Sequence, residues 1–313
     1  MGPSGHRIPA LLAACALLGG APSARAQSGY YNLDGGRPVR VEDATVIERY
    51  ALEIEPLPIR AERSLGAVYR FRAEPHLSYG ILPRTQVEVG LPLEMRDVRG
   101  IRTSGLAGVE LSAMHNFNNE ARFVPAFALW AGTRLPVGAV APKQARVAAR
   151  GIMTRTLPVV RLHVNAEYST TLKSAGCDSL PNGAGCPIVD NGTICFSRAP
   201  IDASCAAGES SRGAALPPPP PGSVRGRWVG GVAIDHVFPL RSLLVAADVF
   251  AERDASRLAR TEWTAESGAR LQLGTQTAAD VGVGRHFTGG DRSWFITAGF
   301  SIELALRPLM RGL

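Results

Sequence analysis

The chain has 313 residues, of which 45% are hydrophobic and 19% charged, and its formal net charge at pH 7 is +7. This length is enough for one large or two ordinary domains. The basic residues are spread singly and form no Lys/Arg block with interleaved aromatics, which argues against nucleic-acid binding. After the N-terminus there is no apolar run of about 18 residues, so no transmembrane helix is predicted.

Residues 1–26 have the pattern of a cleavable signal peptide. A weakly basic start is followed by an apolar core at 8–18 and by the small-x-small cleavage pattern ARA at 24–26. A competing interpretation is a lipobox, LAAC at 12–15, which would place a lipid on Cys15. Either signal directs export, and an exported chain is allowed to form disulfides.

Residues 27–44 are polar, contain glycine and show no period, so we interpret them as a periplasmic lead-in. From Thr45 onward, apolar and polar residues alternate in about twelve segments, for example 69–79 and 87–95. Period two indicates strands with two different faces, and each segment is close to the length of a tilted membrane-spanning strand. We therefore predict a barrel over 45–306.

The last predicted strand, Trp294–Leu304, has one apolar face and one face that becomes polar toward its end. Its pattern T-x-G-x-x-I-x-L resembles the C-terminal signal read by the barrel-assembly machinery, with Leu304 in place of the usual aromatic. Residues 307–313 then form a short basic tail. An edge strand of a soluble sandwich is the alternative interpretation of the same alternation.

The connections between the predicted strands alternate in length. Tight turns are expected at 81–84, 118–120, 157–158, 238–240 and 274–275, and longer links at 56–65, 98–104, 137–145, 173–225, 254–259 and 286–292. Short turns at one end and long loops at the other are typical of outer-membrane barrels, and an even strand count places both termini on the periplasmic side.

Aromatic residues are expected to form a girdle at each end of this barrel. The predicted girdle at the long-loop end contains Trp228, Trp263, Trp294, Tyr168 and Phe250; the one at the short-turn end contains Tyr79, Phe117 and Phe238.

The polar face of the strands carries many acids and arginines. The predicted lumen-lining residues are Arg49, Glu53, Arg70, Arg72, Glu74, Glu88, Glu94, Glu110, Arg134, Arg161, Glu167, Asp235, Asp248, Glu266, Arg270 and Glu303, together with Arg150. They could line a narrow aqueous path, or they could pair with one another and close it. No single residue is predicted to form a selectivity ring.

The stretch 173–225 is the one long irregular link, and it ends in the proline run 217–221. It contains the disulfide candidates Cys177, Cys186, Cys195 and Cys205. Four exported cysteines favour two disulfides, with three pairings open, and their wide spacing differs from the C-x-x-C pairs of zinc sites. The loop could be a lid, a constriction, a recognition surface or a tolerated insertion.

An enzymatic interpretation would rest on His76 and Ser78, which are two residues apart on one strand, where an imidazole could act as base to the hydroxyl. Outer-membrane phospholipases use such a pair facing lipid. In this sequence both residues share the predicted lumen face, beside a short turn. We therefore predict no enzyme, no cofactor and no metal.

Three segments resemble one known family. They read YGILPRTQVEVGLPLEMR (79–96), GLAGVELSAMHNFNNE (105–120) and PAFALWAGTRLPVG (125–138), and the lead-in RPVRVEDA (37–44) is similar to the family's start. These hairpin and turn signatures resemble the outer-membrane proteins of the MetA pathway of phenol degradation family. The resemblance covers most of 37–138 and, more weakly, 226–306. It implies a barrel transporter or pore for small, often hydrophobic molecules.

The sequence therefore predicts an all-β fold, a transmembrane antiparallel up-and-down barrel of about twelve strands in the outer membrane of a Gram-negative-type bacterium. Its expected partners are outer-membrane lipid, the assembly machinery and a small-molecule solute. The predicted function is passive passage of that solute, hydrophobic or aromatic in character. A closed barrel that presents 173–225 to a binding partner is the alternative.

Overall fold

The computed structural model describes residues 31–33, 36–64, 68–98, 100–172, 187–190, 193–196, 226–239, 242–255, 259–288 and 292–305. The predicted signal peptide, the tail and most of the loop 173–225 lie outside these residues. Within them, no helix is long and apolar enough to cross a membrane.

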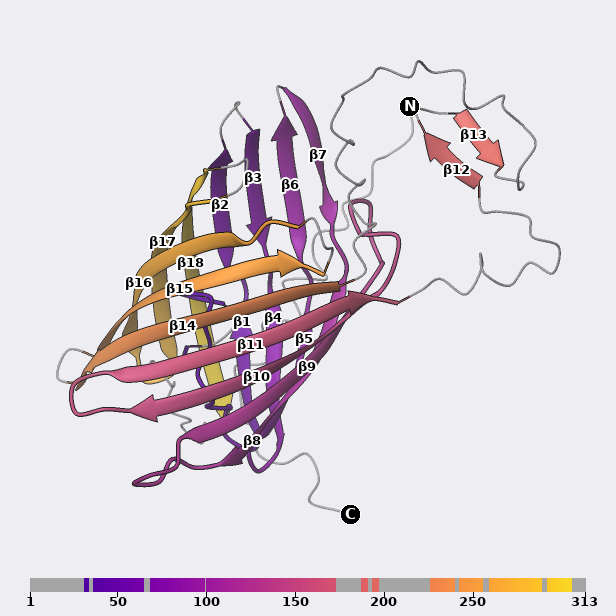
Figure 1. Ribbon diagram of the computed structural model, residues 1–313. Coiled ribbons are helices and arrows are strands. Elements are labelled where there is room, and N and C mark those ends of the chain that lie inside the picture. Colours follow the sequence, from indigo (N-terminus) through magenta and orange to yellow (C-terminus); the bar gives the residue numbers. More distant parts are fainter. Residues whose placement is uncertain are drawn as a thin grey trace, which may run out of the picture.

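Sixteen strands form one antiparallel sheet that closes on itself (Figure 1). Its strands are β1 (Ala51–Glu55), β2 (Ile59–Ser64), β3 (Val68–Ala73), β4 (His76–Leu82), β5 (Thr85–Gly90), β6 (Leu93–Val98), β7 (Ile101–Leu106), β8 (Val109–Asn118), β9 (Ala126–Leu135), β10 (Arg146–Thr156), β11 (Arg161–Thr171), β14 (Gly226–Phe238), β15 (Leu243–Asp254), β16 (Glu262–Gly274), β17 (Thr277–His286) and β18 (Trp294–Ala305). Two further strands, β12 (Pro187–Asp190) and β13 (Thr193–Phe196), pair only with each other.

The barrel wall has twelve strands because the first four are each split into two halves. The halves are β1 and β2, β3 and β4, β5 and β6, and β7 and β8. Strand β18 closes the wall by pairing with β1 at its C-terminal end and with β2 at its N-terminal end. The prediction of a twelve-stranded barrel is confirmed.

A crease runs across the four split strands where proline or glycine interrupts them, and three backbone hydrogen bonds hold it together. The amides of Glu74, Leu91 and Ala107 donate to the carbonyls of Pro58, Pro75 and Pro92 over 3.0, 2.9 and 2.7 Å. Proline has no amide to donate, but its carbonyl still accepts, so the sheet continues past each break.

Two predicted loops are wrong because of this crease. The links predicted at 56–65 and 98–104 contain β2 and β7 instead. The chain is interrupted at Pro56 and Pro58, and the strand resumes beyond them as β2. In Figure 1, β2, β3, β6 and β7 rise beyond the more strongly tilted strands β9–β11 and β14–β16.

The outer face of the barrel is apolar, as the alternation predicts. Its exposed side chains include Leu77, Val89, Leu111, Leu129, Val232, Val249, Val281 and Ile296. Large exposed hydrophobics of this kind, contiguous around a closed sheet, fit contact with lipid.

Aromatic side chains also lie at both ends of the outer face. Trp228, Trp263 and Trp294 are exposed near the starts of β14, β16 and β18, and the Tyr168 ring packs on Trp228 with centroids 4.5 Å apart. Phe250 does not belong to this girdle. It is 1% exposed and faces the lumen, because it shares the inward face of β15 with Asp248.

Candidate functional site: the barrel lumen

The lumen contains the chain's own N-terminal segment, which we define as residues 31–33 and 36–50. Leu33, Val39, Val41, Ala44 and Ile47 in this segment are all at most 6% exposed. The sequence placed residues 27–44 in the periplasm. The described part of that stretch lies instead inside the barrel, because the wall supplies partners for its charges and its backbone.

The N-terminal segment follows the inner wall from β17 back to β5. The four charged residues between 37 and 43 each contact a charge on the wall. The contacts are Arg37 with Asp280 (3.0 Å) and with Glu55, Arg40 with Glu252 (2.7 Å), Glu42 with Arg150, and Asp43 with Arg161 (3.4 Å). Most of these side chains are largely buried, so removing one partner would leave an uncompensated charge.

Hydrogen bonds to side chains of the wall satisfy backbone groups of the same segment. The amide of Val41 donates to Asp248 on β15 over 2.9 Å, and that of Ala44 donates to Thr154 Oγ1 on β10 over 2.8 Å. The amide of Ile47 donates to Gln86 on β5 over 2.9 Å. Buried backbone groups need partners, and the wall side chains provide them where the segment forms no strand.

Glycines on the inner face of the wall provide space for the segment. A Cβ at Gly268 on β16 would lie 2.6 Å from the Cβ of Pro38, and one at Gly282 on β17 would collide with the Pro38 carbonyl. At these two positions the structure shows close approach of a second piece of backbone.

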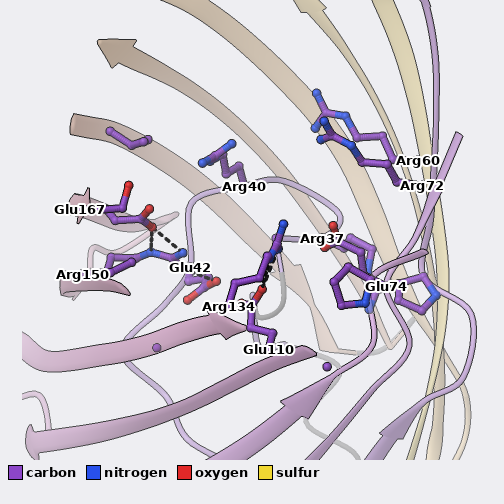
Figure 2. Close-up of a pocket in the computed structure, with 18 of the residues that line it drawn as sticks. Arg37, Arg40, Glu42, Arg60, Arg72, Glu74, Glu110, Arg134, Arg150 and Glu167 are labelled. Atoms are coloured by element: carbon purple, nitrogen blue, oxygen red, sulfur yellow. Dashed lines mark hydrogen bonds and ion pairs between the residues drawn. The ribbon is translucent and has the colours of Figure 1, made fainter. Parts of the chain in front are cut away.

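Above the N-terminal segment, toward the long-loop end, is a main cavity of about 720 Å³. Nine of the predicted lumen residues line it: Arg70, Arg72, Glu74, Glu88, Glu94, Glu110, Arg134, Arg150 and Glu167. Both acids and arginines border it, and Figure 2 shows several of them pointing toward it from different strands.

Cross-strand pairs hold much of this charge in fixed positions. Arg134 on β9 donates to Glu110 on β8 over 2.6 Å, and Arg150 on β10 donates to Glu167 on β11 over 2.7 Å (Figure 2). The Arg150 guanidinium also lies 4.8 Å from the ring centroid of Trp130. Such charge-assisted bonds fix side-chain direction, so this part of the wall is preorganised.

One pair of like charges also faces the cavity. Arg60 on β2 and Arg72 on β3 are direct cross-strand partners, and Figure 2 shows them side by side. Arg60 stacks 3.5 Å from the Phe295 ring centroid and lies 3.4 Å from Glu266. No ion pair between Arg72 and another described residue is seen. Like charges at opposed positions are unfavourable, and Arg72 keeps its charge available to the cavity.

The remaining predicted lumen residues lie deeper and are nearly all buried. Glu53, Asp235, Asp248, Glu266, Arg270 and Glu303 are each at most 7% exposed, and Arg161 bonds Asp235 over 2.6 Å. Arg49 is the exception. It is exposed before β1, with its guanidinium 4.4 Å from the ring centroid of Tyr50.

The sequence did not identify the lumen residues that come from the N-terminal segment or from β2. These are Arg37, Arg40, Glu42, Asp43, Arg60 and Glu62. A usable signal was the alternation at 39–42, where Val39 and Val41 alternate with Arg40 and Glu42. The same alternation was used to assign strands elsewhere in the chain.

A second cavity of about 300 Å³ lies toward the short-turn end. Asn116 on β8, Ala126 on β9 and Thr154 on β10 line it, together with Ala44 and Val46 of the N-terminal segment. Thr45 borders both cavities. The N-terminal segment therefore separates two spaces along one wall of the barrel.

His76 and Ser78, on which an enzymatic interpretation would rest, each contact other residues. His76 Nε2 lies 3.0 Å from Glu55, and its Nδ1 lies 2.9 Å from the Glu74 carbonyl. Ser78 Oγ donates to Glu88 over 3.3 Å. Both ring nitrogens of the histidine therefore have partners other than the serine.

The four disulfide candidates cannot be placed. Cys177, Cys186 and Cys205 lie outside the described residues, and only the backbone is described at Cys195, in β13. The predicted disulfides stay a prediction.

Comparison with solved structures shows the same kind of barrel. The COG4313 outer membrane channel from Pseudomonas putida F1 is similar over 87% of this chain and 100% of its own, with a TM-score of 0.59 and 9% identity. The NanC porin (TM-score 0.47, 7% identity, 79% of this chain and 98% of its own) and the KdgM porin (0.43, 12%, 80% and 98%) are less similar. The first similarity shows an outer-membrane type of barrel fold; the other two add nothing to it. No protein-family model and no curated protein matches the chain.

Proposed function

We propose that the protein is a passive channel for a small molecule in the outer membrane. The observation that supports this most directly is the main cavity of about 720 Å³ inside a closed barrel whose outer face is apolar. That volume is in the range of pockets that hold small ligands. The similar COG4313 protein is an outer membrane channel, which agrees with the proposal.

The N-terminal segment, rather than the loop 173–225, is proposed to narrow the path. Its buried contacts cross the lumen between the two cavities, so a solute must pass it or move it. The sequence suggested that the long loop gates the lumen. That loop lies almost wholly outside the described residues, and its part in gating or in binding a partner stays a prediction.

The resemblance of residues 79–138 to the MetA pathway of phenol degradation family supports a solute with an aromatic or otherwise apolar body. We propose membership of that family on those hairpin signatures. The lumen supports the same solute class at one place, where Trp130 and Met114 border the main cavity among its charges.

The test is reconstitution of the mature protein after a shift on heating in gel electrophoresis has shown a folded barrel. We expect discrete current steps in planar bilayers, and liposome swelling in 4-nitrophenyl glucoside, an uncharged aromatic solute that crosses phospholipid slowly. A folded barrel that gives neither steps nor swelling would contradict the proposed function.

A matched pair of variants shows whether the path is the lumen. Glu74→Trp places a bulky ring at the wall of the main cavity, whereas Leu77→Trp places it on the outer face nearby. We expect only the first to lower conductance and swelling. Equal effects of the two variants would argue for a path outside the barrel.

A further inference from the structure

The wall that connects the two cavities carries a strip of apolar side chains among its polar and charged ones. Met114 on β8, Ala128 on β9 and Ile152 on β10 face inward on adjacent strands and are 2–4% exposed. Trp130 and Ala126 on β9 pack against them. Trp130 lies on the side of the main cavity and Ala126 on the side of the second cavity. Inward positions of a membrane barrel are normally polar, so this apolar strip needs an explanation.

The apolar strip is covered by residues 44–47, which we name the gate residues. Ala44 is 1% exposed and belongs to the same buried cluster as the strip, and Val46 packs against that cluster. Thr45 borders both cavities. The gate residues are therefore the part of the N-terminal segment that separates the cavities along β8–β10.

The gate residues are held differently from the residues before them. Residues 37–43 include four charged side chains that pair with charges on β1, β10, β11, β15 and β17. The contacts of the gate residues with the wall are neutral. They are Ala44 with Thr154 and Asn116 (2.8 and 2.6 Å), Ile47 with Gln86 (2.9 Å), and the apolar cluster.

We propose that the gate residues move away from the apolar strip while residues 37–43 stay anchored, and that this opens an apolar passage between the cavities. The strip gives the passage its selectivity, favouring uncharged solutes with an aromatic or aliphatic body, because a charged solute would be desolvated against it. This inference rests on the proposed channel function and names the path and solute class within it.

The experiment compares two reversible cross-links inside the full-length mature barrel. The background carries Ser at Cys177, Cys186, Cys195 and Cys205, so that only introduced thiols react. Ala44→Cys with Ala128→Cys ties a gate residue to the strip, since both belong to one buried cluster. Val39→Cys with Ala246→Cys is the matched control, because it ties the anchored part to β15 within another buried cluster. A short bis-methanethiosulfonate links each pair, and dithiothreitol releases it.

We expect the gate cross-link to lower the rate of liposome swelling in 4-nitrophenyl glucoside by about tenfold or more, with full recovery in dithiothreitol. The control cross-link should leave the rate unchanged. Recovery on reduction shows that the barrel stayed folded.

Three results would overturn the inference. If the gate cross-link leaves swelling unchanged, solute does not pass there. If the control cross-link blocks as strongly, the whole N-terminal segment must leave. If the background protein without reagent shows no swelling and no current, the proposed channel function fails, and this inference fails with it.

Discussion

Glu42 of the N-terminal segment forms an ion pair with Arg150 of β10. The same guanidinium donates to Glu167 of β11 over 2.7 Å, so one arginine serves two carboxylates inside the lumen. Removing one of the two acids therefore leaves the arginine with a partner, whereas removing the arginine leaves both acids without one.

The first prediction follows from this asymmetry. Arg150→Met leaves Glu42 and Glu167 facing each other without a cation, whereas Glu42→Gln leaves Arg150 paired with Glu167. We expect Arg150→Met to lower the free energy of unfolding by about 2 kcal/mol more than Glu42→Gln does, since hydrogen bonds to charged groups are worth roughly 1.5–3 kcal/mol. Urea unfolding followed by tryptophan fluorescence measures the difference, and an equal or larger loss in Glu42→Gln would contradict the assignment.

The second prediction concerns the space for Pro38. Gly282→Val places a side chain where the Pro38 carbonyl lies, so the N-terminal segment must shift. Overpacking of this kind costs roughly 1–3 kcal/mol, and we expect more frequent or larger current steps because the lumen is less occluded. Gly151→Val on β10 is the control, since a Cβ at position 151 would lie 4.0 Å from its nearest neighbouring atom. Unchanged currents in Gly282→Val would argue against close packing at this position.

The third prediction concerns Arg72, for which no ion pair with another described residue is seen. Arg72 lines the main cavity beside Arg60, so Arg72→Gln removes a positive charge from the path. We expect the reversal potential in a KCl gradient to shift toward cation preference, with little change in stability, because the substitution also relieves like-charge repulsion. Arg63→Gln, on the exposed side of β2, is the control. A shift of the same size in both variants would mean that surface potential, not the cavity, sets selectivity.

The barrel could be predicted because apolar residues of the outer face alternate with polar residues of the inner face along each strand. Val232 and Val249 face lipid on neighbouring strands, and their polar neighbours face inward, so period two alone gives strand and side. Phe250 was misplaced although the same rule applies to it. Phe250 is two residues from Asp248 on the same strand, so both side chains face the lumen. The girdle prediction placed Phe250 by its aromatic side chain and not by its position in the alternation.

The placement of the N-terminal segment could not be predicted in the same way. Val39 and Arg40 alternate as strand residues do, but the partners that bury them, such as Glu252 and Leu244, are distant in the chain. The link predicted at 56–65 failed for a related reason. The strand is interrupted locally at Pro58, whereas the amide of Glu74 on the neighbouring strand donates to the Pro58 carbonyl and keeps the sheet continuous. Both features depend on tertiary contacts that a local pattern does not contain.

The last prediction separates ion flow from solute flow at Trp130. Its ring lies over Gly132 at the wall of the main cavity and packs against the apolar strip. Trp130→Ala widens the cavity, so ions should pass more readily. It also removes the largest apolar surface that borders the strip, so an aromatic solute loses a favourable contact.

We therefore expect Trp130→Ala to raise single-channel conductance while lowering the rate of swelling in 4-nitrophenyl glucoside relative to that in glucose. Trp228→Ala is the control, because that ring is 57% exposed on the outer face. This substitution should change neither the conductance nor the ratio of the two swelling rates. Opposite signs for ions and aromatic solute cannot arise from unfolding, which would lower both. If Trp130→Ala instead raised both rates together, the lumen would be limited by width alone, and the apolar strip would have no part in choosing the solute.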